Sequence, residues 1–118
     1  DLLAAAMNDF FPPVAPPLPV NQRVRDGAGR DWARLADSAA VRRYRWTASR
    51  RVDSTAVARD TVTLRISEST REVSQLRLDA RGTPLGWSRE LVTDVTSRGG
   101  GRAVQATVRQ RIVVRALP

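Results

Sequence analysis

Apolar residues recur at every second position over most of the chain from Val41 onward. Successive side chains of a β-strand point to opposite faces, so this period predicts strands that bury one face only. The alternation predicts five strands, over residues 43–48, 61–66, 75–78, 85–95 and 104–114. The connections between them are short, and we therefore expect the strands to pair antiparallel as a meander.

One segment before these strands has helical spacing instead. Its apolar positions are Trp32, Leu35, Ala36 and Ala39. Asp31 is a good N-cap, and the glycine-rich residues 26–29 predict a turn just before it. We expect a helix over about 32–41 that covers the apolar face of the sheet. The predicted fold class is therefore α+β, a five-stranded antiparallel meander covered by one short helix.

The first 20 residues differ in composition from the rest of the chain. Residues 1–10 carry apolar side chains at helical spacing, which predicts a short helix. Prolines occupy five of the eight positions from 12 to 19. They predict an extended polyproline segment, because each proline fixes φ and lacks an amide donor. We therefore divide the chain into an N-terminal helix and proline-rich arm over 1–20 and a single α+β domain over 21–118.

Two interpretations of this arm remain open. In the favoured one, the arm packs along its own domain through its apolar residues at 10, 11, 14 and 18. In the other, it is a stiff spacer or a ligand for an aromatic groove on a partner. The candidate partner-binding residues are then Pro16, Pro17, Leu18 and Pro19.

The chain contains no cysteine, histidine or lysine, so all 20 basic residues are arginines. Without cysteine and histidine it lacks a thiolate nucleophile, the commonest general base and the usual zinc ligands. Without lysine it lacks a Schiff base and a P-loop lysine. We therefore expect no enzymatic activity, no metal site and no cofactor.

Strand pairing predicts one polar cluster on the apolar face of the sheet. If Leu78 opposes Leu85 across a turn at 80–83, then Ser74 opposes Arg89. Matching the apolar phases of the last two strands places Gln110 opposite Arg89 as well. A buried guanidinium is costly unless it is paired, so this cluster needs an explanation.

The functional interpretation of the cluster is a pocket for a small anion. The candidate ligand-binding residues are Arg89, Gln110, Ser74, Tyr44 and Trp46. The arginine would bind a carboxylate or phosphate, and an aromatic side chain would form an apolar wall. Three alternatives remain open: a β-bulge returns Arg89 to solvent, the cluster lies at an open rim, or Arg89 pairs with Glu72.

The opposite face of the sheet is expected to be rich in arginine. The candidate polyanion-binding residues on it are Arg43, Arg45, Arg109, Arg111 and Arg115. The formal net charge of +8 agrees with a polyanionic partner. No aromatic residue is expected on this face, so nucleic-acid binding would be weak and non-specific. The alternative is a solvated face whose arginines reflect the codon usage of a GC-rich genome.

These features favour a non-enzymatic binding or assembly module with a protein partner. The stiff arm and a start at Asp1, which suggests a trimmed chain, favour the soluble part of a bacterial envelope or secretion/pilus complex. A periplasmic or envelope location is expected over a cytoplasmic one, with membrane contact only through a segment outside this chain. The alternatives are a small-anion-binding domain that uses Arg89 and an electrostatic nucleic-acid binder.

Overall fold

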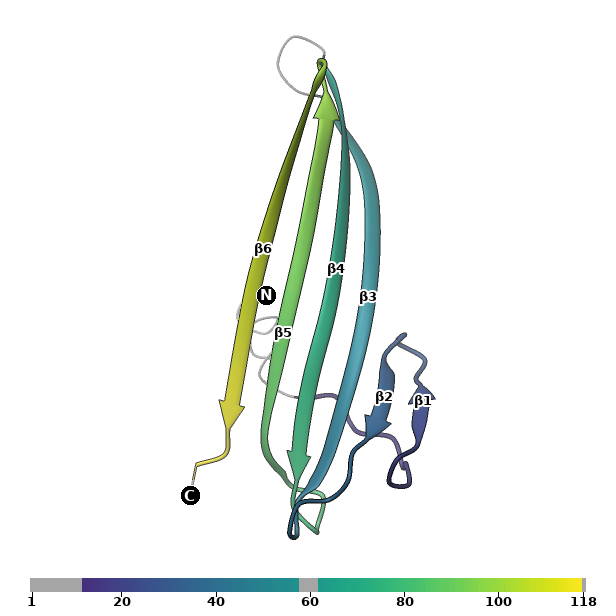
Figure 1. The fold of residues 1–118 in the computed structure, drawn as a ribbon, viewed down its shortest axis with the longest axis vertical. Coiled ribbons are helices and arrows are strands. Elements are labelled where there is room, and N and C mark those ends of the chain that lie inside the picture. Colours follow the sequence, from purple (N-terminus) through teal and green to yellow (C-terminus); the bar gives the residue numbers. More distant parts are fainter. Residues whose placement is uncertain (1–11, 58–61, 118) are drawn as a thin grey trace.

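A single antiparallel sheet makes up the regular structure of residues 12–57 and 62–117, the parts of the chain that the computed structural model describes. The strands are β1 (Arg23–Arg25), β2 (Asp31–Arg34), β3 (Arg42–Val57), β4 (Thr63–Leu78), β5 (Pro84–Gly99) and β6 (Arg102–Arg115). They lie side by side in the order of the sequence (Figure 1). The meander prediction is confirmed, because every strand pairs antiparallel with the next.

The helix predicted over 32–41 is wrong, and with it the α+β class, because the described residues contain no helix. The start of that segment is β2, which pairs with the short β1 and with β3. Asp31 does not cap a helix but forms an ion pair with Arg25 across the β1–β2 hairpin. Four apolar residues at helical spacing are a weak signal over ten positions, and the burial of Trp32 beside Trp46 on β3 outweighs it. The helix predicted over 1–10 lies outside the described residues.

The strands predicted over 61–66 and 75–78 are parts of one strand, β4. Leu64, Ile66, Leu76 and Leu78 share one phase of the alternation. Between them the same phase carries polar residues, from Glu68 to Ser74. The apolar alternation is therefore interrupted, although the strand is continuous. The sheet therefore has six strands among the described residues instead of five, two of them short additions at one edge.

The long strands give the sheet two chemically different faces. Residues paired across neighbouring strands lie on the same face. One face, here called the tryptophan face, carries Trp32, Trp46, Ser74, Arg89 and Ile112 in one row. The next row on that face contains Tyr44, Leu76, Trp87 and Val114. The other face, here called the arginine face, carries the intervening residues.

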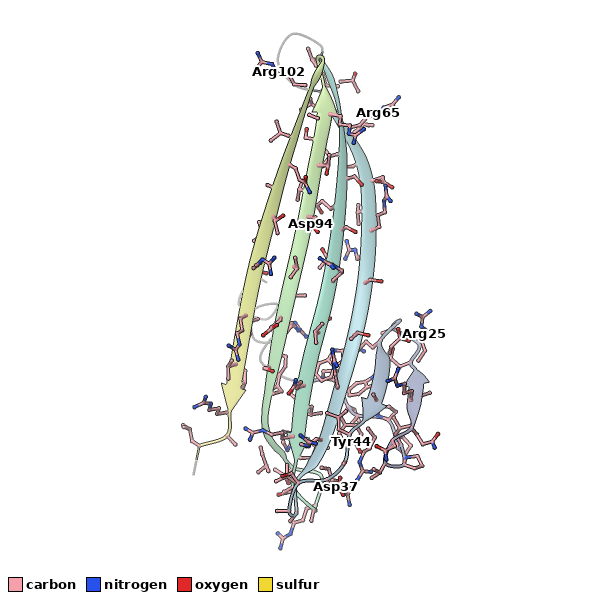
Figure 2. All side chains as sticks on the ribbon, in the orientation of Figure 1. Arg25, Asp37, Tyr44, Arg65, Asp94 and Arg102 are labelled. Atoms are coloured by element: carbon pink, nitrogen blue, oxygen red, sulfur yellow. The ribbon has the colours of Figure 1, made fainter. Side chains whose placement is uncertain are left out.

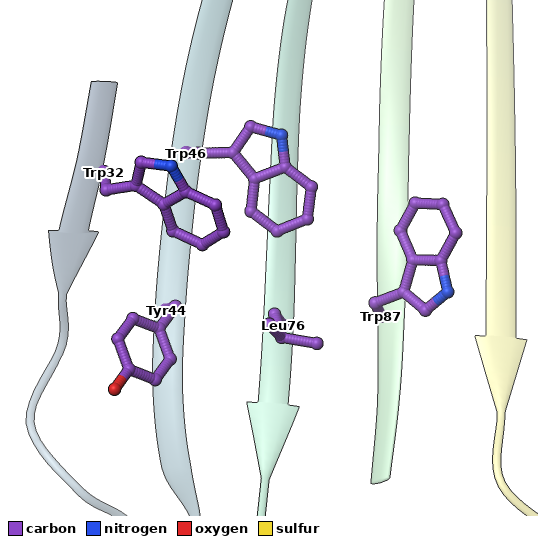
Figure 3. Close-up of a cluster of buried hydrophobic side chains, with 5 residues drawn as sticks. All are labelled: Trp32, Tyr44, Trp46, Leu76 and Trp87. Carbon is purple, nitrogen blue, oxygen red and sulfur yellow. The ribbon is translucent and has the colours of Figure 1, made fainter. Parts of the chain in front are cut away.

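The hydrophobic core occupies one end of the tryptophan face. Its buried apolar residues are Trp32, Tyr44, Trp46, Leu76 and Trp87. Figure 3 shows that these side chains come from β2, β3, β4 and β5 and gather in one layer. The Trp32 and Trp46 ring centroids are 4.8 Å apart, and those of Trp46 and Trp87 are 6.4 Å apart. Aromatic pairs at these distances contribute about 0.5–1.5 kcal/mol each beyond the area they bury.

Beyond this core the sheet continues without a second buried cluster among the described residues. The molecule measures 61 × 31 × 21 Å, and its radius of gyration is 18.6 Å. A compact chain of this length would have a radius of gyration of about 13 Å. Figure 2 shows the extension, with Tyr44 near one end of the sheet and Arg65 and Arg102 at the other.

The β5–β6 pairing differs by two residues from the predicted register. Arg89 faces Ile112, and Gln110 faces Leu91. A shift of two keeps every side chain on its face, so matching apolar phases does not detect it. The turn decides the register: Gly100 and Gly101 both have positive φ, 58° and 74°, which makes them the central pair of a tight hairpin. The β4–β5 end also differs, since Leu78 pairs with Pro84 after an irregularity in the ladder.

Candidate functional site

Glu72 on β4 organises the polar cluster of the tryptophan face. Its Oε1 accepts hydrogen bonds from Ser74 Oγ at 2.9 Å and from Trp46 Nε1 at 3.1 Å. Arg89 Nε lies 2.9 Å from the same oxygen, and the Arg89 and Glu72 side chains are only 18% and 17% exposed. The Arg89 guanidinium also lies over the Trp87 ring, 5.1 Å from its centroid. The cluster is thus a mostly buried ion pair in contact with the side chains of Trp46 and Trp87.

The structure brings together most of the residues proposed for an anion pocket, but in another arrangement. Ser74 pairs with Arg89 across β4 and β5, as expected. Gln110 lies one row farther along the sheet. Tyr44 and Trp46 belong to the buried aromatic cluster, where Trp46 donates to Glu72. The acid partner of Arg89 is therefore Glu72 from its own sheet, which was one of the three alternatives to a pocket.

The arginine face holds twelve of the 20 arginines against four acids, a formal charge of +8. The candidate polyanion-binding residues Arg43, Arg45, Arg109, Arg111 and Arg115 all lie on it. Arg23 and Arg25 of β1 join this face. Sequence reasoning missed them because β1 is three residues long, although the alternation Arg-Val-Arg was visible.

Each acid of the arginine face is already engaged. The four ion pairs are Arg25–Asp31, Arg51–Asp53, Arg71–Asp94 and Arg111–Glu90, with separations of 2.9, 3.4, 3.7 and 3.7 Å. Eight arginines of the face remain without an ion pair to a described acid. Some face one another directly: Arg43 pairs with Arg77, and Arg65 pairs with Arg98. Like charges in opposed positions destabilise a sheet, so these arginine pairs lower its stability.

The arginine face is hollowed beside the β1–β2 hairpin. A depression of about 570 Å³ is lined by Arg23, Arg25 and Arg45 together with Asp31 and Leu35. Only Arg25 of these arginines has an acid partner among the described residues. The depression is therefore a concave site in which two guanidinium groups, those of Arg23 and Arg45, have no ion pair with a described acid.

Asp26 fixes the turn that forms this hairpin. Its carboxylate accepts hydrogen bonds from Trp32 Nε1 at 2.8 Å and from the backbone amides of Ala28 and Arg30, each at 2.9 Å. These hydrogen bonds lower the pKa of Asp26 to about 2. The bond from Trp32 has the largest effect, followed by that from the Arg30 amide. The predicted turn at 26–29 is confirmed, and its aspartate also anchors a core tryptophan.

The arm packs along its own domain over its described part. Ala15 and Leu18 pack against the aromatic core, and Leu18 O accepts a hydrogen bond from Arg34 Nη1 at 3.0 Å. Of the candidate partner-binding residues, Pro16 and Leu18 are half-buried, whereas Pro17 and Pro19 are exposed. Val14 is 94% exposed and does not contribute to this packing. Positions 10 and 11 lie outside the described residues.

The outer edge of β6 is a feature that the sequence analysis did not identify. Within the described chain β6 pairs only with β5, and the first ten of its 14 residues are all exposed. The alternation shows that residues 104–114 form a strand, but only the strand order shows that this strand is an edge.

Other site types find no support in the described part of the chain. Residues 12–57 and 62–117 contain no cluster of three acidic, histidine or cysteine side chains that would hold a metal ion. They also contain no helix that is long and apolar enough to cross a bilayer. A comparison with protein-family models, curated proteins and solved structures finds no match for this chain.

Proposed function

We propose that this chain is a non-enzymatic binding module that assembles with a protein partner along the distal half of its sheet. The distal half of the tryptophan face is defined by the apolar residues Ala48, Val52, Ala56, Leu64, Ile66, Leu91, Val95, Val104, Ala106 and Val108. The observation that carries the proposal is the exposure of valines on its two outer strands, β6 and β3: Val104 is 65%, Val108 50% and Val52 36% exposed.

The charge distribution supports a protein partner on this half of the tryptophan face. In its rows from position 48 to position 54 of β3 the charged residues are Arg50, Glu68 and Glu72, and Glu72 is paired with Arg89. Contiguous apolar surface rimmed by polar residues marks sites of protein association. The missing cysteine, histidine and lysine support a binding role over a catalytic one.

The test is site-specific photo-crosslinking in the source cell. A photoreactive amino acid replaces Val108 on the tryptophan face or, as the matched control, Ser69 on the arginine face. We expect one defined protein adduct from position 108 and none from position 69. The change Val104→Ser elsewhere on the patch should remove that adduct while the melting temperature stays within a few degrees, because Val104 is exposed.

A second candidate function is polyanion binding by the arginine face. The eight arginines of this face that have no ion pair with a described acid favour it, as does the depression beside β1. It predicts sequence-independent binding to duplex DNA, with an affinity that falls steeply as salt rises. Such binding, together with no adduct from either crosslinking position, would replace the protein-partner proposal.

A further inference from the structure

In the described part of the chain, β6 ends the sheet with an edge that pairs with no other strand. It runs over 14 residues, and its ladder with β5 is continuous from Arg102 opposite Gly99 to Arg115 opposite Gly86. It contains no proline and no bulge, two of the devices that block further pairing at a sheet edge, and its four arginines repel only a strand of like charge. The edge thus remains open along the whole strand within the described structure.

The backbone groups that face outward can be assigned from one hydrogen bond. Ala116 N donates to Leu85 O at 3.0 Å, which continues the β5–β6 register beyond Arg115. Hydrogen-bonded and non-hydrogen-bonded pairs alternate in an antiparallel ladder, so even-numbered residues of β6 bond to β5. The amide and carbonyl groups of its odd-numbered residues point to the open edge. These residues are Ala103, Gln105, Thr107, Arg109, Arg111, Val113 and Arg115.

The side chains of β6 define the chemistry of a strand that would pair there. On the tryptophan face β6 presents mainly apolar residues, among them Val104, Val108 and Ile112. On the arginine face it presents Arg109, Arg111 and Arg115. It contains no acid, and the neighbouring acids of β5, Glu90 and Asp94, are already in ion pairs. A complementary strand therefore alternates apolar residues with acids.

We propose that β6 accepts a strand from a different protein, one that alternates apolar and acidic residues and places its acids beside Arg109 and Arg111. A second copy of this chain is a poor occupant. Pairing β6 with itself brings arginines near arginines or neutral residues in every register, since the strand carries four arginines and no acid. This inference rests on the proposed function and specifies the chemistry of the protein partner.

The test uses synthetic peptides of about 12 residues, long enough to span most of the edge at about 3.4 Å per residue. One alternates valine or threonine with glutamate, and its matched partner carries lysine in place of glutamate. We expect the glutamate peptide alone to bind and to slow hydrogen exchange at the outward amides of Thr107, Arg109 and Arg111. Beyond Thr47 the described part of β3 pairs only with β4, and slowed exchange along that segment instead would overturn the assignment to β6.

Two variants separate strand pairing from general charge attraction. Gln105→Pro removes an outward amide without removing a β5–β6 hydrogen bond, and should weaken peptide binding about tenfold or more. Replacing Arg109 and Arg111 with serine should weaken it about fivefold to tenfold, whereas the same change at Arg65 and Arg98 should have little effect. Equal losses from both arginine pairs would overturn the proposal. If position 108 crosslinks a partner but the glutamate peptide has no advantage, this inference fails while the proposed function stands.

Discussion

Replacing Arg89 with methionine should destabilise the domain by about 3 kcal/mol, because it leaves Glu72 charged and mostly buried. Breaking a buried ion pair from one side typically costs about 3–5 kcal/mol. The lower end applies here, since Ser74 and Trp46 still donate to the Glu72 carboxylate and both side chains of the pair keep some contact with water. A domain of this size has a total stability of about 5–15 kcal/mol, so the loss is readily measured.

Neutralising the partner should recover much of this loss. In the double variant Arg89→Met with Glu72→Gln, the side-chain amide oxygen at position 72 can still accept from Ser74 and Trp46. No charge remains buried, so we expect the double variant to lie within about 1 kcal/mol of the wild type. Urea denaturation followed by tryptophan fluorescence measures both, because Trp46 and Trp87 flank the pair.

Arg45→Met is the matched control for this pair of measurements. Arg45 is exposed on the arginine face and has no ion pair with a described acid, so its replacement should change stability by less than about 0.5 kcal/mol. A neutral or stabilising Arg89→Met would refute the structural role of the ion pair and restore the anion-pocket interpretation. A double variant as unstable as Arg89→Met would show that lost packing, and not the orphaned carboxylate, causes the destabilisation.

Two further predictions concern the turns. Because the pKa of Asp26 is lowered to about 2, its ionisation stabilises the fold fully above the unfolded pKa of about 3.9 and this contribution is lost as pH falls through 2. The melting temperature of Asp26→Asn should therefore lie below that of the wild type at pH 7 and approach it at pH 2; a constant gap would contradict the assignment. Gly101→Ala should cost about 1 kcal/mol in urea denaturation because φ is 74° there, and Gly101→Asn less, since asparagine tolerates this conformation. Equal costs for alanine and asparagine would show that φ is not the cause.

The sequence predicted the long strands better than it predicted the segment over 32–41, which begins as the short strand β2. The alternation around Tyr44 and Trp46 on β3 is strong because these two side chains are buried and the arginine between them lies on the other, exposed face. The same rule failed between Ile66 and Leu76, where the tryptophan face itself carries polar residues. The helix prediction failed because the spacing of Trp32 and the apolar residues after it does not distinguish a helix from a short strand such as β2.

The candidate site was predictable in part, for a reason set by register. Ser74 opposite Arg89 followed from the turn at 80–83, although the end of that hairpin differs, and a shift of two in β6 displaced Gln110 without changing its face. The choice between an open pocket and an ion pair with Glu72 depended on side-chain position, which no period in the sequence reports. Glu72 was an alternative because it shares a face with Arg89, and the hydrogen bonds from Ser74 and Trp46 orient its carboxylate toward the guanidinium.

The two ends of the sheet are stabilised in different ways, because apolar side chains are fully buried at only one of them among the described residues. All fully buried apolar side chains of the described residues lie at the core end, from Trp32 to Trp87 across four strands. The distal half of β3 to β6 is held mainly by its backbone ladder and by cross-strand contacts such as Thr70–Thr93 and Thr107–Asp94. Strands without a packed face have little hydrophobic stabilisation, so this half gains more from an added apolar partner than the core end does. Within the described residues, β6 is an edge strand along both halves, which allows a partner strand to pair beside the core and to extend over the half that has no packed face.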